Sequence, residues 1–286
     1  DYYREQVALP ESEQKDCNFT GILDSIELYN RKELDSEKIL DIRAAYYGMV
    51  EYQDMLVGQV KKAWDKYLQD SDRKGVFSYL SDHGDQIGEK RLYTKCTMFE
   101  GATRIPLIIA GDNIKNNHRV KSPVSIMDLT PTFCEMTDAP PIPVQDGVSL
   151  IPELSEAKEN PERAIFSEFM SHLSGHNCMI RHGKWKLITH SKKTDSDILI
   201  DLENDPDELT NIITEFPEEA AKLMSQILSK WDSEKLEKEA EIIRKNIDII
   251  AQWGKETQPE NTDQVLLPTY KINNGIVTRS TIKGIK

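Results

Sequence analysis

The stretch "VFSYLSDHGDQIGEK", residues 76–90, decides the fold of this chain. Its first five residues are mostly apolar or aromatic and follow a glycine, which predicts a short β-strand over 76–80. Two side chains that can bind a cation, Asp82 and His83, come directly after the strand. Ligands of open α/β sheets bind beyond the carboxyl ends of strands. We therefore expect a binding site at this turn.

The segments on either side complete an α/β pattern. Apolar residues recur at helical spacing before the strand and predict a long amphipathic helix, roughly 36–69, capped by Ser36 and lying on a core. After the turn, "RIPLIIAG" (104–111) predicts a strand buried on both faces. "SIMDLTPTFCEM" (125–136) predicts another helix. Helix, strand, strand and helix in this order indicate an α/β fold.

The pattern changes after residue 155. Runs at 163–169, 178–190 and 197–205 predict three strands, and their short connections favour an antiparallel sheet. Gly183 predicts a turn or bulge inside the middle run. A charged helix is expected from about 218 to 254, followed by an extended arm. We expect three parts: residues 1–155, 156–255 and 256–286.

Composition and charge limit the classes of partner. The chain has 286 residues and a formal net charge of −13, which argues against nucleic acid, because phosphate contacts need clustered lysine and arginine. No apolar run is long enough to predict a membrane segment. The residues after Asp263 include no acidic side chain, so this basic arm is expected either to dock on a second copy in a homo-oligomer or to be a disordered tail. The first residues identify no compartment.

The turn at 82–83 has two interpretations on its residues alone. A carboxylate and an imidazole side by side can bind one divalent metal ion; oxygen ligation suits calcium, and the histidine favours manganese without excluding calcium. The alternative is a plain turn in which Asp82 caps the next segment.

Four widely spaced cysteines, without a C-x-x-C pair, are expected to be free buried thiols.

A longer motif surrounds this turn. The sequence "SDHGDQIGEKRLYTKCTMFEGATRIPLII", residues 81–109, resembles the sulfatase signature of the alkaline-phosphatase-like superfamily. "VSIMDLTPTFCEMTDAP" (124–140), "CMIRHGKWKLI" (178–188) and "LIDLENDPDELTNI" (199–212) resemble later sulfatase segments. The resemblance runs from about residue 36 to about 230. Within the family, the chain looks most like choline-sulfatase-type enzymes.

The resemblance implies a fold and roles for three residues. The fold would be part of an alkaline-phosphatase-like mixed sheet flanked by helices, plus a smaller C-terminal antiparallel sheet with a helix. Residues 1–155 would be the later part of the catalytic domain. Asp82 and His83 would be metal ligands, and Lys95 would bind the sulfate of a small-molecule or glycan sulfate ester. Glu100 and Arg104 are expected to form a structural pair.

A sulfatase also needs a nucleophile, which the family makes by oxidising the first residue of a Cys/Ser-x-Pro/Ala-x-Arg segment to formylglycine. None of the four cysteines here begins such a segment. We therefore expect a fragment whose other part lies upstream or in a separate chain, and expect residues 1–286 alone to be inactive.

Two other functions are compatible with these residues. The first is hydrolysis of a phosphate or phosphonate ester, which uses the same Asp-His metal pair. The second is a non-catalytic assembly module built on the C-terminal sheet and arm. Outside the motif, His176 is expected to lie in a surface loop.

Overall fold

The computed structural model describes residues 2–14, 34–171, 174–257, 270–273 and 276–279. The chain forms two compact units, Asp1–Leu236 and Glu237–Lys286, and each is described by itself. No helix within the described ranges combines the length and apolar character needed to cross a bilayer.

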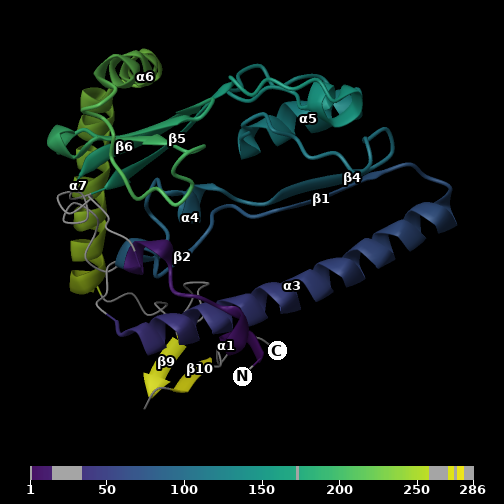
Figure 1. The fold of residues 1–286 in the computed structure, drawn as a ribbon, viewed down its shortest axis with the longest axis horizontal. Coiled ribbons are helices and arrows are strands. Elements are labelled where there is room, and N and C mark those ends of the chain that lie inside the picture. Colours follow the sequence, from purple (N-terminus) through teal and green to yellow (C-terminus); the bar gives the residue numbers. More distant parts are fainter. Residues whose placement is uncertain (1, 15–33, 172–173, 258–269, 274–275, 280–286) are drawn as a thin grey trace. The chain divides into compact units, whose positions relative to one another are not determined.

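The long helix predicted near residue 36 is present as α3 (Ser36–Ser71), the long blue helix that runs diagonally across the lower half of Figure 1. Its N-cap is Asp35 rather than Ser36, because the Asp35 carboxylate accepts the backbone N–H of Lys38 at 2.8 Å.

The prediction that α3 lies on a core is wrong for most of the helix: Ile39 is its one buried residue. A helix of 36 residues is about 54 Å long, whereas a five-residue strand spans only about 17 Å. The strand beside α3 is too short to cover it.

Strand β1 (Val76–Leu80) has the predicted bounds and pairs antiparallel with β4 (Leu107–Gly111). The register places Val76 opposite Gly111 and Leu80 opposite Leu107. Burial of β4 on both faces is not observed, because the Ile108 side chain is 58% exposed. Among the described residues this sheet has two strands, so one face of β4 stays partly open.

Between β1 and β4 the signature motif folds into short elements. These are β2 (Gln86–Ile87), a 3-10 turn, β3 (Tyr93–Thr94) and α4 (Glu100–Thr103). The helix predicted over 125–136 begins with a 3-10 turn and continues as α5 (Leu129–Met136). Ser125 and Asp128 form a capping box at the start of the 3-10 turn.

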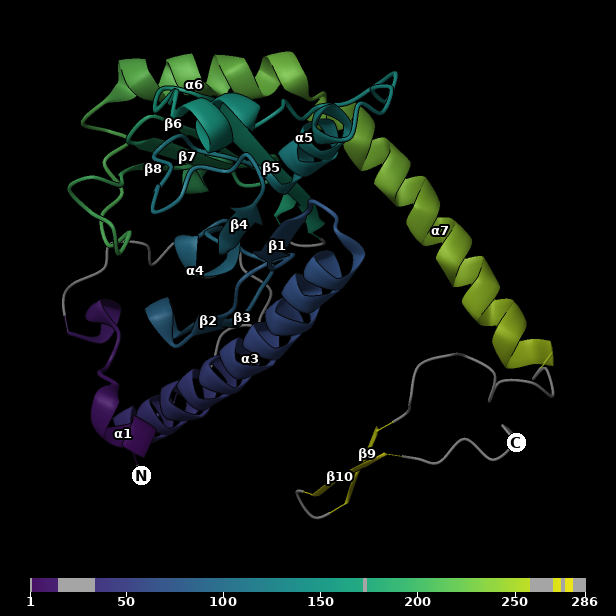
Figure 2. The ribbon, with the colours of Figure 1, turned by 90° about the vertical axis from the view of Figure 1, so that its right-hand side faces the viewer.

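The C-terminal part of the first unit is a four-stranded antiparallel sheet. Its strands are β5 (Ala164–Ser171), β6 (Gly175–His182), β7 (Trp185–His190) and β8 (Ile198–Asp201), in this spatial order. Gly183, with φ of 59°, forms a tight turn between β6 and β7, so the predicted middle strand is two. Helix α6 (Pro217–Lys230) packs across one face, as Figure 2 shows.

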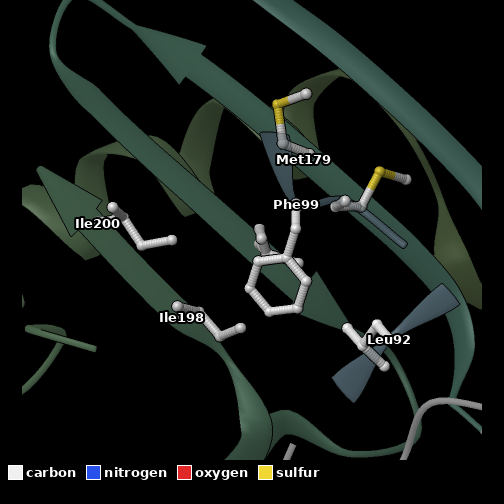
Figure 3. Packing of buried hydrophobic residues seen from close by; sticks show 7 residues of the cluster. Leu92, Phe99, Met179, Ile198 and Ile200 are labelled. Carbon is white, nitrogen blue, oxygen red and sulfur yellow. The ribbon is translucent and has the colours of Figure 1, made fainter. Parts of the chain in front are cut away.

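The other face of this sheet packs against the signature motif. Leu92 and Phe99 from the motif contact Met179, Ile198 and Ile200 from the sheet, and all five are at least 95% buried (Figure 3). Burial of side chains of this size contributes about 1.5–3 kcal/mol each. The hydrophobic core therefore joins the loop that carries Lys95 to the C-terminal sheet.

The single charged helix predicted over 218–254 is wrong, because the chain contains two helices here. Helix α6 ends at Lys230 and α7 (Ser233–Thr257) begins three residues later. Trp231 is extended between them, and its indole packs edge-on against Phe166 and His176. The Asp232 carboxylate then accepts the Lys235 N–H and caps α7. Burial of the indole thus interrupts a helical pattern.

Most of α7 belongs to the second unit, together with the hairpin β9 (Tyr270–Asn273) and β10 (Ile276–Arg279). The expected extended arm is a two-stranded ribbon where it is described; residues 258–269, 274–275 and 280–286 lie outside the described residues. The division into 1–155, 156–255 and 256–286 stays a prediction.

Candidate functional site

The turn after β1 orders the two predicted metal ligands. The backbone N–H of His83 donates to Asp82 Oδ1 at 3.0 Å, and the Ser81 hydroxyl donates to the His83 carbonyl oxygen at 2.6 Å. The Asp82 side chain is 83% exposed and the His83 side chain 34% exposed. The turn therefore presents a carboxylate and an imidazole to the surface, in adjacent positions.

Glycines allow the two halves of the motif to touch. The Gly84 N–H donates to the Ala102 carbonyl oxygen at 2.8 Å. A Cβ on Gly84 would lie 2.2 Å from the Gly101 carbonyl oxygen, so only glycine fits here. This close approach anchors the turn at 81–85 on α4, seventeen residues later in the chain.

The His83 ring is oriented by a backbone carbonyl. Its Nδ1 lies 3.1 Å from the Gly84 oxygen, which favours the tautomer with the proton on Nδ1 and a lone pair on Nε2. That Nε2 lies 2.7 Å from Lys95 Nζ and 3.6 Å from Asp82 Oδ2. All three predicted site residues therefore come together, although Lys95 is twelve positions beyond His83.

The backbone around Lys95 is in an uncommon conformation. Its two neighbours, Thr94 and Cys96, have φ of 67° and 69°. Positive φ at a β-branched residue costs about 1–3 kcal/mol and is typical of functional loops.

Cys96 is exposed and Cys134 half-buried, so the prediction of buried thiols is right only for Cys178 among the described cysteines.

The electrostatics of the turn favour an ionised carboxylate. The pKa of Asp82 is lowered, first because its oxygen accepts the backbone N–H of His83, and further by the positive charge of Lys95. An anionic oxygen is the form that binds a divalent cation.

The Asp82 carboxylate and the His83 Nε2 fit one metal ion as two of its ligands. The donors are adjacent, the imidazole tautomer is suitable, and the carboxyl group favours its ionised form. No group of three or more metal-binding side chains occurs in the described part of the chain. On their own, these two residues would therefore make only part of a metal site.

A cavity of about 280 Å³ opens beside the three residues. Asp82, His83 and Lys95 line one part of it, and strand β5 lines another. The remaining lining is largely apolar, contributed by Met98, Ala102, Ile105, Val124, Ile126 and Met179. The cavity can therefore hold a charged group against Lys95 and an organic group against the apolar wall.

Two charged residues missed in the sequence, Lys186 and Glu208, hold α4 in place through Glu100. Lys186 on β7 is fully buried, and its Nζ lies 2.9 Å from Glu100 Oε1 and 2.8 Å from Glu208 Oε1. The other Glu208 oxygen accepts the Glu100 N–H at 2.7 Å. The expected pair of Glu100 with Arg104 is wrong, because Lys186 is the partner. A lysine in an otherwise apolar strand was the available signal.

The histidine assigned to a surface loop is buried. His176 lies on β6 with 2% of its surface exposed. Its Nε2 lies 2.5 Å from Glu168 Oε2 and its Nδ1 lies 3.0 Å from Ser233 Oγ. Glu168 precedes Phe169, which packs in the core on the opposite face of the sheet, so this cluster points away from that core.

The chain also resembles known protein families. Residues 4–139 match the sulfatase domain, and residues 88–237 match the C-terminal domain of N-sulphoglucosamine sulphohydrolase. The second match alone covers 150 of the 286 residues. The chain belongs to the sulfatase family. Sulfatases generally depend on a divalent metal ion.

Among relatives, this sulfatase is 34% identical over 202 residues to arylsulfatase K of Gallus gallus, covering 67% of this chain and 37% of that protein. The chain spans less than half of the length of the arylsulfatase K proteins that it matches. The narrower likeness to choline sulfatases stays a prediction.

Solved structures show the same alkaline-phosphatase-like α/β fold. The phosphonate monoester hydrolase of Silicibacter pomeroyi superposes with a TM-score of 0.65, at 23% identity, over 79% of this chain and 50% of that one. A structure solved in complex with its substrate D-glucosamine-2-N,6-O-disulfate superposes with a TM-score of 0.59, at 23% identity, over 74% and 45%. The predicted α/β fold class is confirmed.

Proposed function

We propose that this chain is part of a sulfuric ester hydrolase and contributes its sulfate-binding lysine and two of its metal ligands. The observation that carries the proposal is the convergence of Asp82, His83 and Lys95 on one cavity. Membership of the sulfatase family supports it.

The chemistry follows from the charge of the ester. A sulfate monoester is an anion, and negative charge grows on the bridging oxygen as the S–O bond breaks. The Lys95 ammonium, reoriented from the His83 ring toward the ester, would stabilise that charge. When bound by Asp82 and His83, calcium or manganese would polarise the sulfate oxygens. The formylglycine nucleophile would come from outside residues 1–286.

The cavity supports a small-molecule or glycan sulfate ester as substrate. Its volume of about 280 Å³ is near the lower end of the usual range for ligand sites. The disulfated glucosamine bound by a structural neighbour belongs to the same chemical class. Self-association through the arm at 256–286 remains part of this proposal.

Alkylation of Cys96 tests anion binding by the chain itself. This exposed thiol lines the cavity next to Lys95, so bound sulfate should slow its reaction with iodoacetamide. Cys134 lies outside the cavity lining and is the internal control. Protection should disappear in Lys95→Met and persist in Lys66→Met, a change on the exposed face of α3. Equal protection in both variants would refute the assignment of Lys95.

Turnover tests the reaction itself. In the whole protein, Lys95→Met should lower kcat/KM for a chromogenic aryl sulfate by about 100-fold or more, as loss of one transition-state contact does. Lys66→Met should leave it unchanged. Residues 1–286 alone should not hydrolyse the ester. Turnover by this chain alone would contradict the expected external nucleophile.

A second candidate is hydrolysis of a phosphonate ester, favoured by the likeness to the Silicibacter pomeroyi enzyme. Comparison of kcat/KM for matched aryl sulfate and aryl phosphonate substrates distinguishes the two reactions.

The third alternative, a non-catalytic assembly module, predicts that the whole protein binds no metal ion at Asp82 and His83. Calorimetry with calcium and manganese tests this, and absence of binding would favour the assembly module.

A further inference from the structure

Helix α7 carries an apolar surface that nothing covers within the described part of its unit. Six large side chains between 242 and 253 are each between 57% and 65% exposed: Ile242, Ile243, Ile247, Ile249, Ile250 and Trp253. The match to the sulfatase C-terminal domain ends at residue 237, so most of α7 lies beyond it. The helix is therefore an addition to the matched domains and needs its own explanation.

An isolated helix with this composition is not expected to be stable in water. Helices of this kind gain most of their stability by packing an apolar face, and isoleucine is a weaker helix former than alanine or leucine. Each fully buried isoleucine contributes about 1.5–3 kcal/mol. Covering this face would thus stabilise α7 substantially.

The spacing of the apolar residues indicates what covers the face. Leu236, Ala240, Ile243, Ile247 and Ile250 are separated by alternating steps of four and three residues. This is the a/d spacing of a coiled coil, in which a second helix packs against the same seam. The set puts Leu236, Ile243 and Ile250 at d, and Ala240 and Ile247 at a.

The charges beside this seam complement a second copy of the same helix. Glu239 occupies position g and Arg244 position e of the following heptad. In a parallel pair, position g of one helix faces the e position five residues on in its partner. Glu239 would then face Arg244 of the neighbouring copy, which gives an attractive pair between adjacent helices.

We propose that α7 forms a parallel coiled coil between copies of this chain. The helix has six acidic and five basic side chains between Ser233 and Thr257, which gives no attraction to an anionic membrane. The proposal is independent of hydrolase activity and concerns the seam of α7 rather than the arm.

The helix offers a closely matched control. Ile243 and Ile250, on the seam, are 57% and 65% exposed, whereas Ile242 and Ile249, at position c outside it, are 58% and 65% exposed. We expect Ile243→Lys with Ile250→Lys to convert the oligomer into a monomer in analytical ultracentrifugation, raising the dissociation constant at least 100-fold. Ile242→Lys with Ile249→Lys should leave the oligomer intact.

A charge exchange tests the parallel orientation without touching the seam. Glu239→Lys or Arg244→Glu alone should weaken association several-fold, and the double exchange should restore it. A wild-type chain that is monomeric throughout, or equal loss of association in both isoleucine pairs, would overturn the proposal. So would a monomer that binds anionic vesicles or another protein through α7. Circular dichroism of each variant reports whether the remaining fold is retained.

Discussion

Replacement of Lys186 by methionine removes the one ammonium between two carboxylates in the core. The Lys186 side chain is 0% exposed, and those of Glu100 and Glu208 are 17% and 3% exposed. Burial raises the pKa of Glu100, but the Lys186 charge and hydrogen bond outweigh this and hold the pKa below its ordinary value. Without Lys186 the two carboxylates would face each other with little water.

The expected cost is large. Removal of one partner from a buried ion pair destabilises a protein by about 3–5 kcal/mol, since an uncompensated buried charge remains. For a domain of this size, that lowers Tm by about 6–20 °C. The neighbouring Lys184→Met is the control. Lys184 pairs with Asp201 but is 36% exposed, so its loss should cost about 1 kcal/mol or less.

The assay is urea denaturation followed by tryptophan fluorescence at pH 7 and pH 5. In Lys186→Met the pKa of Glu100 should rise, because burial then acts without the lysine charge, so the variant should recover stability as the pH falls and a proton binds. Adding Glu208→Gln should recover part of the loss at pH 7. If Lys186→Met costs no more than Lys184→Met, or costs the same at both pH values, the reasoning is wrong.

Two further changes probe the turn and the buried titratable pair. Gly84→Ala should displace the turn from Gly101 and destabilise the chain by about 1–3 kcal/mol in urea melts, whereas Gly58→Ala, in open space on α3, should stabilise it by about 0.5–1 kcal/mol. Burial raises the pKa of Asp197 to about 7 and lowers that of His190 to about 4. The raised pKa makes ionisation of Asp197 unfavourable in the folded state, so its contribution to the free energy of unfolding falls as the pH rises from 4 to 7. The lowered pKa makes protonation of His190 unfavourable in the folded state, so its contribution falls as the pH drops from 6.5 to 4. The two pH dependences therefore nearly cancel. Asp197→Asn should leave only the second dependence, a loss of about 3 kcal/mol between pH 7 and pH 4; an unchanged pH profile would contradict it.

Several elements were predictable because their determinants lie close together in the chain. Strand β1 has the predicted bounds, and α3 differs by two residues at its C-terminal end. Both follow from local periodicity and bounding residues. The break between α6 and α7 was not predictable, because it depends on Trp231 packing against Phe166, sixty-five residues away.

The sequence by itself determined the motif: adjacent Asp82 and His83 after a strand, with a lysine at a fixed spacing. Adjacency in the chain brings those two side chains to one turn in any fold that keeps the strand. Only the tertiary structure decided that Lys95 Nζ meets His83 Nε2 and that Lys186 secures Glu100 from eighty-six positions away. Such contacts depend on how separate elements pack, because burial and close approach are properties of the whole fold and leave no periodic signal in a single chain.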